Sequence, residues 1–140
     1  MDGNGTARHQ GRELSVLVVY ANFAVATAVS QRLLDLASVE LARPRSAVLH
    51  LSGRRRYDAV VLCPYMSVTD RERVLARCHS EAAPTTSIDL LDTEQGLRVD
   101  VSDCPGGRSG NVSVLPRSLS PALEAVVSAL RAPAHTSDGL

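Results

Sequence analysis

The apolar run Ala59-Val60-Val61-Leu62, which ends at Cys63, decides the fold. Four consecutive apolar residues without alternation are typical of a strand that is covered on both faces, as parallel sheets require. A second run of this kind is Val16-Leu17-Val18-Val19, and Ser87 to Leu91 is expected as a further strand. The chain therefore predicts several buried parallel strands.

Segments of helical periodicity alternate with these strands. The segment from Phe23 to Ala37 carries an apolar stripe at spacings of four, four and three residues, which indicates a helix facing a sheet. Its members are Val25, Val29, Leu33 and Leu36.

Two further helices have recognisable starts. Thr69 and Glu72 are spaced as a capping box, which predicts a third helix from about Asp70 to Ser80. Near the C-terminus, Ser120 is expected to cap a helix whose first residue is Pro121. The inward-facing residues of these helices are predicted to be Val74, Leu75 and Cys78, and Leu123, Val126, Val127 and Leu130.

Alternating strands and helices predict an α/β fold. Short loops imply right-handed crossovers and a three-layer, doubly wound parallel sheet, for which we expect the flavodoxin-like order 2-1-3-4-5. Residues 93–111 break the pattern, because they contain four glycines, one proline and no helical stripe. The alternation of Leu97, Val99 and Val101 suggests a short extended piece. We expect a loop or extended segment in place of the fourth helix, as a mobile flap over the sheet edge.

Length and composition indicate one domain. The chain has 140 residues, of which 44% are hydrophobic, enough for a single core. We expect a disordered leader at residues 1–13, a folded domain at 14–131 and a flexible tail at 132–140. No stretch approaches the roughly 18 apolar residues of a membrane span, and the polar start lacks a signal-peptide core. These features predict a cytoplasmic protein that does not bind membranes.

The charged residues exclude several function classes. All fifteen basic residues are arginine and fifteen acids balance them, so no strong field favours nucleic acid. The absence of lysine excludes a Schiff-base enzyme and a P-loop lysine. The dense run 54–56 is expected to cap the second helix and stay solvated rather than bind phosphates. Three cysteines and four scattered histidines show no metal or disulfide spacing, so we expect no cofactor and a reducing compartment.

The order and spacing of residues 14–131 resemble those of a response-regulator receiver domain, a bacterial, flavodoxin-like family that includes the chemotaxis regulators. Met66 lies three residues after Cys63, where receivers often have methionine. The segments 39–42, 46–51 and 56–62 are similar in order and spacing to the family's second strand, second helix and third strand. The segment 114–121 resembles its fifth strand and the turn after it. The residues that would line the receiver's phosphorylation pocket are Tyr20, Ala21, Asn22, Cys63, Asp92 and Arg117.

The resemblance implies a receiver that has lost its chemistry. Cys63 stands at the position of the phosphate-accepting aspartate, Tyr20 and Ala21 stand where the family carries its magnesium-binding acidic pair, and Arg117 stands for the family's lysine. Phosphoryl transfer needs a carboxylate nucleophile, acids for magnesium and a cation. Only the cation remains, and Asp92, at the place of a hydroxyl residue, is a poor magnesium site alone. Aspartyl phosphorylation is therefore not expected.

The pocket residues leave alternatives open. Cys63 is either a thiolate activated by Arg117 or an inert, buried small residue. Arg117 either binds an anion or pairs with Asp92 or a loop carbonyl. Tyr20 is expected to fill the emptied pocket with its ring.

From the resemblance we expect a stand-alone, receiver-like signal-transduction module, related to phosphorelays, that is not an enzyme and acts by protein–protein interaction. The expected partner is another signalling protein, such as a histidine kinase or an output protein, and the module itself is expected to be a monomer or weak dimer. The alternative is a small-ligand or thiol redox sensor that uses Cys63 and Arg117. A small hydrolase or reductase is a third class, but no nucleophile and base are paired in the sequence.

Overall fold

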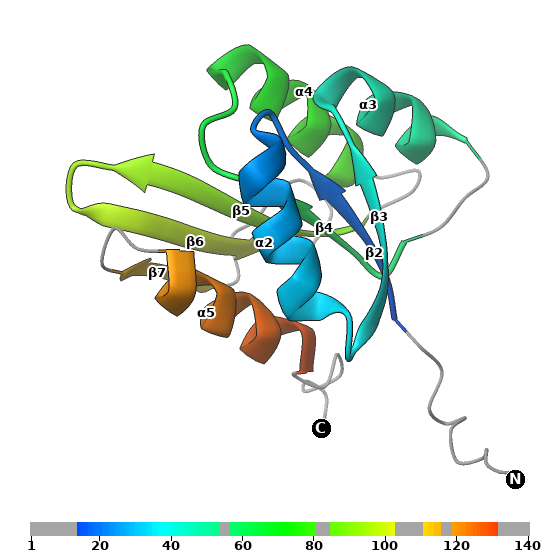
Figure 1. Ribbon diagram of the computed structural model, residues 1–140. Coiled ribbons are helices and arrows are strands. Elements are labelled where there is room, and N and C mark those ends of the chain that lie inside the picture. Colours follow the sequence, from blue (N-terminus) through cyan, green and yellow to red (C-terminus); the bar gives the residue numbers. More distant parts are fainter. Residues whose placement is uncertain (1–13, 54–56, 81–84, 103–110, 116–118, 132–140) are drawn as a thin grey trace, which may run out of the picture.

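The computed structural model describes residues 14–53, 57–80, 85–102, 111–115 and 119–131 (Figure 1). The expected leader and tail, the arginine run 54–56 and Arg117 lie outside these residues. The elements, in chain order, are β2 (Leu14–Val19), α2 (Phe23–Leu33), β3 (Ala37–Ala42), α3 (Pro44–Ser52), β4 (Ala59–Leu62), α4 (Val68–Cys78), β5 (Thr86–Thr93), β6 (Gly96–Ser102), β7 (Asn111–Leu115) and α5 (Leu119–Arg131). No helix within the described ranges has the length and hydropathy needed to cross a membrane.

The strands form one sheet in the order β3-β2-β4-β5-β6-β7. The first four strands are parallel, with Val18 of β2 level with Val61 of β4, and Val61 level with Ile88 of β5. β6 is antiparallel to both of its neighbours, so β7 runs in the same direction as β5. The α/β class and the predicted order of five strands are confirmed, with β6 inserted between the fourth and the fifth.

β6 replaces the fourth helix, as the alternation of its apolar residues indicates. It is not a flap over the sheet edge, because it forms ladders with both β5 and β7. Leu97 and Val99 are buried on the face that α5 covers. A tight turn joins β5 to β6: the Thr93 hydroxyl donates to the Gly96 carbonyl at 2.7 Å, and Gly96 has φ of 140°, which suits glycine. Burial of one face and backbone pairing on both sides hold this segment in the sheet.

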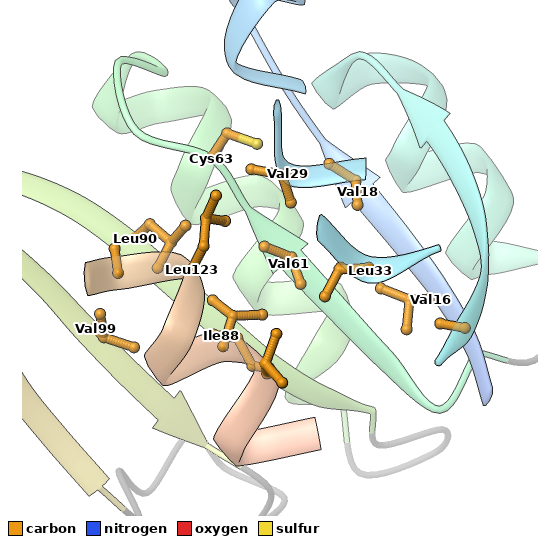
Figure 2. Packing of buried hydrophobic residues seen from close by; sticks show 14 of the residues in the cluster. Val16, Val18, Val29, Leu33, Val61, Cys63, Ile88, Leu90, Val99 and Leu123 are labelled. Atoms are coloured by element: carbon orange, nitrogen blue, oxygen red, sulfur yellow. The ribbon is translucent and has the colours of Figure 1, made fainter. Parts of the chain in front are cut away.

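Helices cover both faces of the sheet (Figure 1). α2 and α5 pack on one face around a cluster that includes Val18, Val61 and Ile88, shown in Figure 2. α3 and α4 pack on the other face around Leu17, Val60 and other buried residues. Consecutive residues of β2 and β4 thus enter opposite layers, which explains why these strands are continuously apolar.

Several helix boundaries differ from expectation. α2 ends at Leu33, and Ala37 already opens β3. α4 begins at Val68, because the hydroxyl of Ser67, rather than Thr69, accepts a hydrogen bond from the Asp70 amide at 3.1 Å. In α5, Ser120 lies inside the helix rather than before it. The start of α4 is shifted because Ser67 and Thr69 both suit a cap, and helix ends are in general defined only to within one or two residues.

Candidate functional site

The carboxyl ends of β2 and β4 bring the first predicted pocket residues to one edge of the sheet. The Tyr20 amide donates to the Ala42 carbonyl at 3.1 Å, and the Cys63 amide donates to the Val19 carbonyl at 2.9 Å. These bonds continue the parallel ladders one residue beyond each strand, so Tyr20 and Cys63 lie at about the same level. Open parallel sheets bind ligands at this edge, beyond the carboxyl ends of their strands.

Tyr20 has two neighbours that the sequence pattern did not indicate. The Phe23 ring meets the Tyr20 ring edge-on, with centroids 5.8 Å apart and an interplanar angle of 66°. The guanidinium of Arg43 lies over the Tyr20 ring, with its central carbon 5.3 Å from the ring centroid. Arg43 is the residue before α3, so β3 and α3 supply this contact. Edge-on ring pairs and cation–π contacts are favourable, and together they fix the Tyr20 ring at the sheet edge.

Ala21 and Asn22 do not form a polar pocket. Ala21 is exposed and carries no functional group. The Asn22 side chain caps α2, because its Oδ1 accepts hydrogen bonds from the amides of Ala24 at 2.9 Å and Val25 at 3.3 Å. Asparagine is among the best N-cap residues, so a structural role accounts for Asn22.

Cys63 is buried within the layer formed by α2 and α5. Its side chain is among the cluster residues of Figure 2 and belongs to the same cluster as Val61 and Leu90. Burial raises the pKa of the Cys63 thiol to about 12, because an apolar environment disfavours the thiolate. Of the alternatives left open for Cys63, the inert, buried residue is the one that this environment supports.

Asp92 lies farther along the sheet than the other predicted pocket residues. β4 is paired with β5 only as far as Leu62, which is opposite Asp89, so Leu90 occupies the level of Cys63. Asp92 follows two residues later, roughly 7 Å farther along the strand, where it is paired with Leu97 of β6. The structure therefore brings Tyr20, Ala21 and Asn22 close to Cys63 but does not add Asp92 to them.

Tyr65 is a further residue of this edge that sequence reasoning missed. It lies in the connection from β4 to α4, between the buried residues Pro64 and Met66, and is itself 58% exposed. Its φ of 76° is in the left-handed region, the only such value at a non-glycine position among the described residues. A bulky residue in this conformation is strained, and strained residues gather at functional sites. Tyr65 thus holds an exposed ring at the sheet edge against a backbone cost.

A group of charged side chains lies between α4 and the hairpin of β5 and β6. Asp89 and Asp100 are directly opposite each other in the antiparallel ladder. Arg71 of α4 lies 3.6 Å from Asp89, measured from Nε to Oδ2, and Arg98 lies 3.6 Å from Asp100. The Asp89 side chain is only 13% exposed, and its Oδ1 is buried without a hydrogen-bond partner.

These surroundings perturb the Asp89 carboxyl. Burial is the main cause that raises its pKa to about 6, and the Asp100 charge raises it further, whereas Arg71 and Arg98 oppose the rise. Perturbed carboxyls of this kind occur both in active sites and in structural ion-pair networks. Here two arginines and two aspartates link α4 to the hairpin. No cluster of three or more His, Cys, Asp or Glu suited to a metal is present in the described part of the chain.

Comparison of the chain with models of protein families, with characterised proteins and with solved structures finds no match.

Proposed function

We propose that this chain is a receiver-like signalling module that is not phosphorylated and acts by binding another protein at the carboxyl edge of its sheet. The resemblance in element order suggests the signalling role. Tyr20, Ala21 and Cys63, in place of three carboxylates, support the loss of phosphoryl transfer.

The arrangement of the aromatic side chains carries this proposal. The chain has only four aromatic residues, and three of them, Tyr20, Phe23 and Tyr65, lie at the carboxyl edge. The Phe23 side chain is 60% exposed, close to the value for Tyr65. Tyrosine and arginine are enriched among the residues that dominate protein–protein binding energies, and phenylalanine is enriched in the cores of interfaces. Two exposed rings at an edge that also carries Arg43, on the Tyr20 ring, therefore favour a protein-binding surface over a phosphate pocket.

A thiol redox sensor is less well supported than a binding module. A reactive cysteine needs a lowered pKa and access to solvent, and Cys63 has a raised pKa and 1% exposure.

The first test concerns phosphate. We expect no phosphoryl uptake from acetyl phosphate with magnesium, and no magnesium-dependent binding of beryllofluoride, because the described edge offers no paired carboxylates. Mass spectrometry under conditions that preserve acyl phosphates is the measurement. An acyl-phosphate adduct mapped to residues 58–70 would contradict the proposal.

The second test concerns the aromatic edge. A variant that combines Phe23→Ser and Tyr65→Gly removes both exposed rings, and Leu34→Ser is the matched control, because Leu34 is 59% exposed after the far end of α2. Proteins captured from source cells by the unmodified chain are purified and titrated against all three forms. We expect the control to keep its affinity and the edge variant to lose at least about tenfold, or 1.4 kcal/mol. Equal binding by all three forms would refute a docking role for this edge.

A further inference from the structure

α3 and α4 leave an open groove on the outer side of their layer (Figure 1 shows the two helices side by side). Its volume is about 310 Å³, and its lining residues are Pro44, Arg45, Val48, Leu49, Asp70 and Arg73. Both helices start at the carboxyl edge of the sheet, since each follows a strand that ends there. The groove therefore begins next to the edge that carries Tyr65.

α3 has apolar residues on two sides. Ala47 faces the sheet and is its only buried residue, while Val48 and Leu51 are partly buried against the same cluster. Leu49 faces away from the sheet and is 70% exposed. A helix with apolar residues outside its core-facing stripe usually buries that second side as well. Leu49 and the exposed part of Val48 thus form an apolar surface that no described element of the chain covers.

The rim of the groove is positively charged. Arg45 and Arg73 are exposed, and neither forms an ion pair with any residue of the chain that the structure describes. Asp70 is the only acid of the lining, and it lies in the first turn of α4, where the helix dipole favours its negative charge. α3 contains no acidic residue. A ligand with negative charge on both flanks would complement this rim.

We propose, resting on the function proposed above, that the groove binds the apolar face of an acidic amphipathic helix from a partner protein. The volume suits two apolar anchors, since a cavity of about 150 Å³ holds one benzene-sized group. Anchors one turn apart, with charges beside them, are the pattern of helices that bind in grooves.

Other occupants fit the groove less well. Small-molecule sites place a few polar groups inside an apolar pocket, whereas the charged groups here stand at the rim. An extended peptide pairs with a strand edge, and the groove lies between two helices. A second copy that used the same face would bring the Arg45 and Arg73 guanidiniums of both chains together, which is repulsive.

The test uses a displayed library of helical peptides of about 16 residues, roughly 24 Å long. The apolar stripe varies among Leu, Ile, Met and Phe, and the flanking positions vary among Glu, Gln and Lys. Selection on the unmodified protein should enrich Glu at the flanks. Selection on the double variant Arg45→Glu, Arg73→Glu should enrich Lys instead. The inference would be overturned if the selected peptides showed no preference for Glu or Lys at their flanks on either protein, or if the unmodified protein enriched no peptide at all.

A selected peptide then locates the contact. Leu49→Ser should weaken its binding at least about tenfold, and Leu34→Ser, at a residue of similar exposure, should leave it unchanged, with circular dichroism to show that both variants fold. Amide shifts on peptide binding should map to residues 44–49 and 68–73. Shifts confined to Tyr20, Phe23 and Tyr65 would refute the groove while leaving the proposed function intact. If the unmodified protein self-associates and Leu49→Ser blocks this association, a second copy of the chain is the occupant, and the inference of an acidic helix is overturned.

Discussion

Replacement of Asp89 by asparagine should stabilise the protein at neutral pH and remove part of its pH dependence. The ordinary pKa of this carboxyl is 3.8, and in the folded chain burial, reinforced by the Asp100 charge, raises it to about 6. The folded state therefore holds a proton more tightly than the unfolded state. Protonation favours folding, so the cost of the ionised Asp89 is fully present above pH 6 and is lost as the pH falls through 6 toward 3.8.

The size of this cost follows from the two pKa values. At about 1.36 kcal/mol for each unit of pKa, a rise from 3.8 to about 6 corresponds to a cost of about 3 kcal/mol at pH 7.5. Roughly half of it remains at pH 5. Asparagine has nearly the same shape and no charge, so Asp89→Asn should raise the free energy of unfolding at pH 7.5 by up to about 3 kcal/mol, and this gain should disappear near pH 4.

Urea denaturation of the unmodified protein and the variant at pH 4, 5, 6 and 7.5 provides the measurement. The difference between the two proteins isolates Asp89 from other titrating groups. Asp35→Asn, at an exposed aspartate, is the control and should show no comparable trend. A variant that is less stable at pH 7.5 would refute the reasoning, because it would mean that attraction by Arg71 and Arg98 exceeds the cost of burial.

Three further outcomes are expected. Tyr65→Gly should raise the free energy of unfolding by about 0.5–1 kcal/mol, because glycine adopts the left-handed conformation without strain; Tyr65→Ala should show no such gain in thermal or urea denaturation, and an equal gain would rule out backbone strain. Cys63 and Cys78, both with pKa values raised to about 12 mainly by burial, should react with a thiol probe at pH 7 only when the chain unfolds; fast labelling of the native protein, read by mass spectrometry, would revive the redox sensor. Asn22→Ala should destabilise the protein by about 1 kcal/mol through loss of the α2 cap, and unchanged stability in urea would show that the cap contributes little.

The parallel part of the sheet was predictable because several short apolar runs, each readable on its own, indicate buried strands. Every residue from Val16 to Val19 and from Ala59 to Leu62 is buried, so both runs are apolar throughout and can hardly be mistaken for a half-exposed strand. The alternation of Leu97 and Val99 likewise indicates an extended segment. Whether such a segment pairs inside a sheet or lies over its edge depends on long-range contacts, which a single sequence does not display.

The candidate site was predictable only in part. Tyr20 and Cys63 could be placed at the carboxyl edge because they directly follow buried strands. Arg43 could not be paired with Tyr20, since their contact depends on the turn between β3 and α3. The exposure of Tyr65 depends on one positive φ, and tyrosine itself gives no hint of that conformation.

The concentration of rings at one edge gives the protein a natural optical probe. The chain has no tryptophan and three tyrosines, two of which, Tyr20 and Tyr65, lie at the proposed docking edge. Tyr57, the third, is anchored elsewhere by its hydroxyl, which donates to Glu40 at 2.8 Å. Intrinsic tyrosine emission therefore comes largely from the edge, and a partner that brings a tryptophan there would quench it by energy transfer. Docking can be followed with the unlabelled, unmodified chain.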